Sequence, residues 1–247
     1  MNFAWFSESK AIAIVFTLAA CASTPATAQS TTPAQTTDIR DRLSAGVVVT
    51  EEFNDNIFST RAKKEADWIT KIAPWLGVRL GNDDARVNLG ASAEIGAYAE
   101  NSSEDYEDYR FFADGRFRLA PGFLSFGNIS HEHEHEDRGS PDDVNGATPT
   151  EYDASRAILA ILKQFNSTSV KLGATYDRYN FDDSGVINND DRDRHHVTAG
   201  VRVEQRLNPA TRIFGEATYD TRRYRASLDD NGFDRDSDGV RAAVGLS

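Results

Sequence analysis

The chain has 247 residues, of which 39% are hydrophobic and 10% aromatic, and its formal net charge is −12. Such an acidic chain lacks the basic face that a nucleic-acid partner requires, so we expect no nucleic acid among its partners. No internal apolar run reaches the ~18 residues that a membrane helix needs, which excludes a helical membrane protein. A transmembrane β-barrel stays compatible with this composition, because barrel strands alternate apolar and polar side chains.

The first 42 residues differ in character from the rest of the chain. The apolar run Ala11–Ala20 follows Lys10 and is too short to span a membrane. This pattern predicts a secretory signal peptide over residues 1–28. Residues 29–42 begin with a stretch rich in Thr, Pro and Ala, and we expect them to form a disordered periplasmic segment.

Two processing sites compete at the end of this signal. Ala26-Thr27-Ala28 resembles an ordinary signal-peptidase site, with cleavage after Ala28. Leu18-Ala19-Ala20-Cys21 instead resembles a lipobox, which would lead to cleavage before Cys21 and its lipidation. Cys21 is the only cysteine, so no intramolecular disulfide can form.

From Leu43 onward the dominant pattern is alternation with a period of two. It is clearest in Arg86–Glu100, where Val87 and Leu89 lie on one face and Asn88 and Glu94 on the other. About ten strands are visible, several as long as the ~9–11 residues that a tilted membrane strand needs. The other predicted strands are Leu43–Glu52, Trp68–Leu80, Tyr109–Leu119, Phe123–Glu136, Arg156–Phe165, Val170–Phe181, the two arms of His195–Tyr224, and Gly239–Ser247.

Two stretches leave a choice open. The Ala/Ile/Leu run of Arg156–Phe165 could be helical, but ten residues between turn signals favour a strand. Pro74 interrupts Trp68–Leu80 and is compatible with an edge strand or a β-bulge, because proline cannot donate to a ladder.

The connections alternate between short and long. Short periplasmic turns and long outer loops are typical of bacterial outer-membrane barrels, so we expect an antiparallel up-and-down transmembrane β-barrel over residues 43–247. The short turns lie near Asn82, Pro121, Ser167 and Pro209, and the long loops follow Glu52, Glu100, Glu136, Phe181 and Ala226.

The pattern resembles the Putative beta-barrel porin 2 family of outer-membrane proteins. The resemblance rests on VTEEFNDNIF, KEADWITKIAPWLGVRL and VTAGVRVEQRLNPATRIFGEATYDTRRY, and it extends from Leu43 to the end. It implies outer-membrane lipid and the barrel-assembly machinery as partners, and for some members polysaccharide export proteins. The chain ends in Val-Gly-Leu-Ser without the terminal aromatic residue usual in bacterial barrels, so we expect C-terminal strands to be missing.

The alternation places a set of charged side chains on the face opposite the apolar one. In a small barrel such charges pair and fill the interior, whereas in a wider barrel they line water and set ion preference. About ten strands is nearer the first case. The expected lumen-lining charges are Arg79, Arg86, Glu94, Arg110, Asp114, Arg116, Arg118, Lys171, Asp177, Arg202, Glu204, Arg206, Arg212, Glu216, Asp220 and Arg222, with Lys71 on the same face.

Other motifs carry weaker signals. His131, His133 and His135 share one face of a strand, but same-face positions ~6.6–6.8 Å apart do not bring three imidazoles onto one metal ion. The acidic clusters at Asp229–Gly232 and Asp234–Gly239 do not match a calcium-binding loop. We therefore expect no metal and no cofactor.

A hydrolase would need a serine beside a histidine, and nothing in the sequence brings Ser125 or Ser130 to one. The sequence thus favours a porin-like channel or an exopolysaccharide-export-associated component of the outer membrane, without catalysis. The alternative is a structural or adhesive surface barrel that uses its acidic outer loops.

Overall fold

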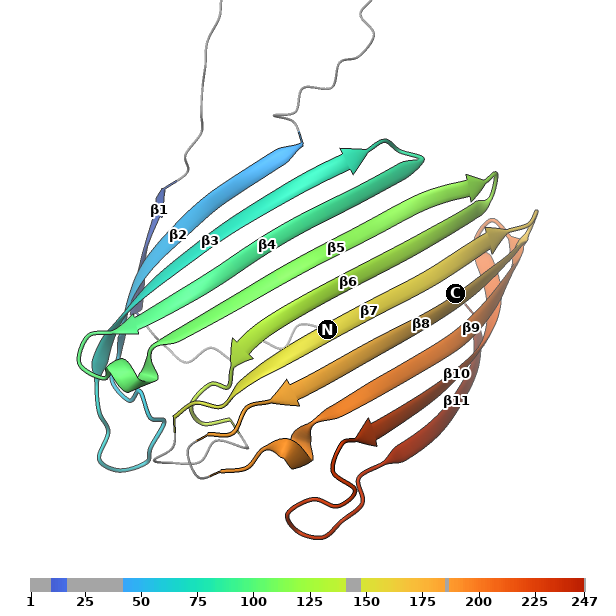
Figure 1. Cartoon of the computed structure of the whole chain (residues 1–247). Coiled ribbons are helices and arrows are strands. Elements are labelled where there is room, and N and C mark those ends of the chain that lie inside the picture. The colour runs from blue at the N-terminus through green and yellow to red at the C-terminus, as the bar shows by residue number, and fades with distance from the viewer. Residues whose placement is uncertain (1–9, 17–41, 141–147, 185–186, 247) are drawn as a thin grey trace, which may run out of the picture.

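The computed structural model describes residues 10–16, 42–140, 148–184 and 187–246, which form one antiparallel sheet of eleven strands. Each strand pairs with the next one along the chain, from β1 to β11 (Figure 1). The strands are β1 (Lys10–Phe16), β2 (Leu43–Asn54), β3 (Asp67–Gly81), β4 (Ala85–Tyr98), β5 (Tyr106–Ala120), β6 (Phe123–His135), β7 (Glu151–Gln164), β8 (Thr168–Phe181), β9 (Arg194–Asn208), β10 (Thr211–Tyr224) and β11 (Ser237–Leu246).

The expected all-β, up-and-down antiparallel class is confirmed. Ten strands begin at or after Leu43, and the stretch Arg156–Phe165 belongs to strand β7 rather than to a helix. Two single-turn 3-10 helices, η2 (Ser102–Glu104) and η3 (Asp190–Arg192), lie in the long connections. Because every strand neighbours the next in sequence, the short turns all lie at one end of the sheet and the long loops all lie at the other.

The sheet is strongly curved and open (Figure 1). Among the described strands, β1 and β11 form the two edges and do not pair with each other. We call one end the short-turn end and the other the long-loop end. The short-turn end carries residues 82–84, 121–122, 165–167 and 209–210, and the long-loop end carries residues 55–66, 99–105, 136–150, 182–193 and 225–236.

The first strand falls within the predicted signal peptide. Lys10–Phe16 pairs antiparallel with Val47–Phe53 of β2. The rest of residues 1–28, with Cys21 and Ala28, and residues 29–41 lie outside the described residues, so their processing stays a prediction. Cleavage at either predicted site would remove β1 and leave β2 as the edge of the sheet.

Pro74 lies at neither an edge nor a bulge. Strand β3 pairs on both sides, and Pro74 lies opposite Val47 of β2. On the β4 side the ladder runs through Ile72–Ile95, resumes at Trp75–Ser92 and keeps the same register. The missing N–H of proline therefore interrupts one ladder locally without shifting the pairing.

The sheet has almost no conventional core. Among the described residues the buried hydrophobic side chains are Ile57, Ile69, Tyr106 and Phe181, all near the long-loop end. Large apolar side chains instead point outward from one face, with 63% of Leu159 and 45% of Leu172 exposed. A continuous exposed apolar surface is unfavourable in water but is what a lipid-facing sheet needs.

Candidate functional site

The register of the sheet places the predicted lumen charges on one face, which we call the polar face. One row of direct cross-strand partners runs from Ser130 through Arg156, Asp177 and His196 to Arg222. Direct partners share a face, and alternate residues along each strand return to it. The polar face accordingly carries Arg79, Arg86, Glu94, Arg110, Asp114, Arg116, Arg118, Lys171, Asp177, Arg202, Glu204, Arg206, Arg212, Glu216, Asp220 and Arg222.

Several of these charges form ion pairs with a neighbouring strand. Arg156 of β7 contacts Asp177 of β8 with Nε and Oδ1 2.5 Å apart, and Asp177 is buried. Arg110 of β5 contacts Glu132 of β6 at 3.1 Å, and Arg202 of β9 contacts Glu216 of β10 at 2.9 Å.

Further ion pairs join residues of one strand or of neighbouring strands. Glu204 accepts from Arg202 of its own strand at 3.3 Å and from Arg212 of β10 at 3.0 Å. Lys71 of β3 contacts Glu52 of β2 at 2.9 Å. Each pair named here joins side chains of one strand or of adjacent strands, so these pairs lie along the wall and do not bridge distant strands.

Two further carboxylates of the polar face have neutral partners. Glu94 accepts a hydrogen bond from the hydroxyl of Tyr106 at 2.6 Å, and Asp114 accepts one from Nδ2 of Asn88 at 2.9 Å. Sequence alternation places Glu94 and Asp114 on the correct face but does not identify these partners, which depend on the β4–β5 register.

A polar hollow of about 370 Å³ lies on this face between β5 and β8. The ion pairs of Arg110 and Arg156 line it, as do Glu134 and Tyr152. The Tyr152 hydroxyl donates to Oε2 of Glu134 at 2.6 Å, and its ring stacks on Phe181 with centroids 5.2 Å apart. The hollow therefore combines charged groups with an aromatic ring.

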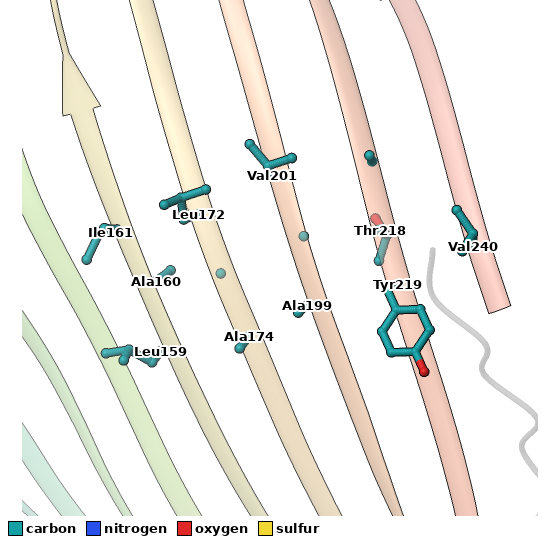
Figure 2. A pocket seen from close by; sticks show the side chains of 13 residues that line it. Leu159, Ala160, Ile161, Leu172, Ala174, Ala199, Val201, Thr218, Tyr219 and Val240 are labelled. Atoms are coloured by element: carbon teal, nitrogen blue, oxygen red, sulfur yellow. The ribbon is translucent and has the colours of Figure 1, made fainter. Parts of the chain in front are cut away.

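The opposite face, which we call the apolar face, is hollowed only shallowly. A depression of about 590 Å³ lies on this face. Its lining includes small residues such as Ala174 and Ala199 (Figure 2). Larger side chains line it as well, among them Leu159, Leu172 and Val201. Its lining is nearly all apolar, with hydroxyl groups only on Thr218 and Tyr219, so this surface offers few hydrogen-bonding groups for a polar solute.

At the long-loop end, arginines hold the loops to one another. Arg138 in loop 136–150 makes a two-point ion pair with Glu104 in loop 99–105, with both contacts at 2.7 Å, and both side chains are buried. The Arg138 guanidinium also lies over the Phe58 ring of loop 55–66, 5.7 Å from its centroid. This one side chain thereby connects three loops.

The same arrangement continues around the rim. Arg192 pairs with Glu136, Arg225 contacts Asp193 at 3.2 Å, and Arg235 contacts Asp191 at 3.0 Å. These pairs link loop 182–193 to loops 136–150 and 225–236. A cavity of about 390 Å³ lies at this end and includes Lys71, Glu104 and Arg138 in its lining. The only sequence signal for these links was the presence of arginines within acidic loops.

The three histidines do not converge. His131 and His133 lie near Asp153 of β7, at 3.7 and 3.0 Å, whereas His135 contacts Asp108 of β5 at 2.9 Å and stacks on Tyr106. Within the described residues no group of three or more His, Cys, Asp or Glu side chains could hold a metal ion.

The serines considered for a hydrolase are not beside a histidine side chain. Ser130 lies on the polar face, whereas the adjacent His131 projects from the other face and contacts Ser155 at 3.0 Å. The carboxylate nearest to His131 is Asp153, at 3.7 Å, and it is hydrogen-bonded to His133 instead. The structure therefore shows no aligned serine, histidine and carboxylate at this position.

Within the described residues, no helix is long and apolar enough to cross a membrane.

The chain was compared with curated proteins, solved structures and protein families. No curated protein matches the chain. A solved structure of the copper transporter OprC is similar at 10% identity and a TM-score of 0.46, covering 83% of this chain and 38% of OprC. Residues 43–247 match the profile of the family described as Putative beta-barrel porin 2, so the chain belongs to that family.

Proposed function

We propose that the chain forms the wall of a porin-like channel in the bacterial outer membrane and catalyses no reaction. The observation that carries this proposal is the course of the ion pairs on the polar face. Arg110–Glu132, Arg156–Asp177 and Arg202–Glu216 each join adjacent strands, so these charges neutralise one another along the wall and do not bridge distant strands. This arrangement favours a lining over the filled interior expected of about ten strands.

The other face and the strand lengths support a membrane setting. Strands β3 to β10 have 13–15 residues, more than the ~9–11 that a tilted strand needs to cross a bilayer. Their apolar face exposes side chains such as Phe111, Leu159 and Leu172. We infer that this face contacts lipid and that the long-loop end is extracellular, because outer-membrane barrels carry their longer loops outside.

The adhesive alternative finds less support. An adhesive surface would use the carboxylates of the acidic loops, and four of these, Glu104, Glu136, Asp191 and Asp193, are bound by arginines of neighbouring loops. These contacts favour a fixed rim around an opening. Export of an exopolysaccharide stays a prediction that rests on the family resemblance.

Reconstitution in planar lipid bilayers tests the proposal. Full-length protein, isolated from outer membranes, should give stepwise currents whose size scales with salt concentration. If protein that is shown to be folded by its resistance to protease gives no current, the channel proposal is overturned. Association with the inner-membrane fraction after cell fractionation would overturn the proposed location.

A lipid-hydrolysis assay tests the absence of catalysis. Fatty-acid release from phospholipid vesicles should be no greater for the protein than for Ser155→Ala, which removes the hydroxyl beside His131. Release that the substitution abolishes would overturn this part of the proposal.

A further inference from the structure

Two arginines face each other on the polar face near the short-turn end. Arg86 of β4 and Arg116 of β5 are direct cross-strand partners. Like charges in this position repel each other, and they normally destabilise a sheet unless something of opposite charge lies between them. Among the described residues neither side chain forms an ion pair with a carboxylate; in addition, Nε of Arg116 is buried and has no hydrogen-bond partner.

The nearest acids are occupied by other groups. Asp84 accepts from Nε of Arg118 at 2.6 Å, and Asp114 accepts from Asn88. On its other side Arg116 lies opposite Phe126, which brings no charge. Asn88 is neutral, so Asp114 keeps its charge, but among the described residues it forms no ion pair with Arg86 or Arg116, and the two arginines have no direct anionic partner in the wall.

Basic residues extend this site along the short-turn end. Arg79 lies opposite Asn88, one same-face position from Arg86, and Arg118 lies one same-face position from Arg116. Toward the long-loop end, by contrast, the polar face carries Glu52, Glu94, Asp108, Glu132 and Glu134. Lys71 and Arg110, toward the long-loop end, thus have carboxylate partners, whereas Arg79, Arg86 and Arg116 have none among the described residues.

We propose that Arg86 and Arg116 form an oxyanion-binding site at the short-turn mouth of the channel, with Arg79 beside it. A guanidinium presents a planar fork of N–H donors that matches carboxylate, phosphate and sulfate, and two opposed forks can hold one oxyanion between them. The ligand class is an oxyanion, either free in solution or carried on an acidic saccharide. This inference rests on the proposed function only for the role of the site in transport.

Equilibrium binding tests the site independently of conduction. Inorganic phosphate is titrated into detergent-solubilised full-length protein by calorimetry, and the urea midpoint is measured with and without phosphate. Phosphate should bind and raise the midpoint, because a ligand that binds only the folded state stabilises it. Arg86→Gln and Arg116→Gln should each weaken binding about tenfold or more, since each removes charge-assisted hydrogen bonds.

Two further variants make the result specific. Arg178→Gln removes the same charge from an exposed residue on the other face of β8 and should leave phosphate binding unchanged. Arg116→Lys keeps the charge but loses the fork, so it should bind more weakly than the wild type and more tightly than Arg116→Gln. Without phosphate, Arg86→Gln should not lower the urea midpoint, because it relieves repulsion.

The source of the oxyanion is distinguished by competing ligands. If a hexuronic acid oligosaccharide displaces phosphate and a neutral oligosaccharide of equal length does not, the ligand is an acidic saccharide. If neither oligosaccharide displaces phosphate, the ligand is a free anion. The site is overturned if the wild type binds no phosphate, or if both glutamine variants bind as the wild type does. Phosphate binding without bilayer current would retain the site and reject the channel, and current without phosphate binding would do the reverse.

Discussion

The ring of Phe112 on β5 covers Gly90 of β4, its direct cross-strand partner on the polar face. A β-carbon at Gly90 would lie only 2.2 Å from Cε1 of Phe112. The same relationship recurs between Trp75 and Gly46, and between Tyr106 and Gly96. In each case an aromatic ring fills the space above a glycine, which shields the backbone and helps to hold the pairing register.

Gly90→Ala should therefore destabilise the sheet. The new methyl group has to displace the Phe112 ring, and overpacking of this kind costs about 1–3 kcal/mol. The measurement is the free energy of unfolding in urea, with the protein in lipid vesicles. Gly173→Ala is the matched control on the same face, because its β-carbon would meet Ala160 at an ordinary 3.6 Å. It should leave stability unchanged or raise it by up to ~1 kcal/mol; equal losses at both sites would contradict the role of Phe112.

The buried ion pair between Glu104 and Arg138 should contribute far more to the free energy of unfolding than an exposed ion pair does. Glu104→Gln removes the charge that compensates Arg138, and breaking one side of a buried pair costs about 3–5 kcal/mol. Asp84→Asn breaks the exposed Arg118 pair at a short turn and should cost at most ~1 kcal/mol. Unfolding in urea measures the difference, and limited proteolysis should show earlier cutting in loops 55–66 and 99–105 of the Glu104 variant only. Equal costs would mean that the rim is solvated.

The two faces should tolerate charge very differently. Arginine at Ala199, on the apolar face of β9, should cost roughly 2–4 kcal/mol if that position lies near the middle of the bilayer. The next residue, Thr198, lies on the polar face, where arginine should have a mild effect. Folding yield and urea stability in vesicles compare the two variants. If both are tolerated equally well, no bilayer touches the apolar face.

Epitope tags report the orientation of the barrel. Tags inserted at Asn188 and Asn231, in the long loops, should be accessible to antibody on intact cells, whereas tags at Asn82 and Pro209, in the short turns, should not. A tag at Asp142, which lies outside the described residues, should be accessible as well. The reverse labelling would invert the proposed topology, and equal labelling at all sites would argue against a spanning barrel.

The alternation in the sequence was sufficient to predict the strands and their two faces. A period of two is a local property, because each backbone residue reverses the direction of the next side chain. That is why Arg86, Arg116 and Arg202 could be placed on the polar face, and why the alternating connection lengths predicted the up-and-down order.

The partners across strands were decided only by the tertiary structure. A shift of two residues between neighbouring strands preserves the same faces, so alternation alone cannot distinguish one such register from the next. The opposition of Arg86 and Arg116, and the covering of Gly90 by Phe112, both depend on the single register that β4 and β5 adopt. The contact of Arg138 with Glu104 depends further on how two irregular loops fold, where the sequence has no repeating pattern to follow.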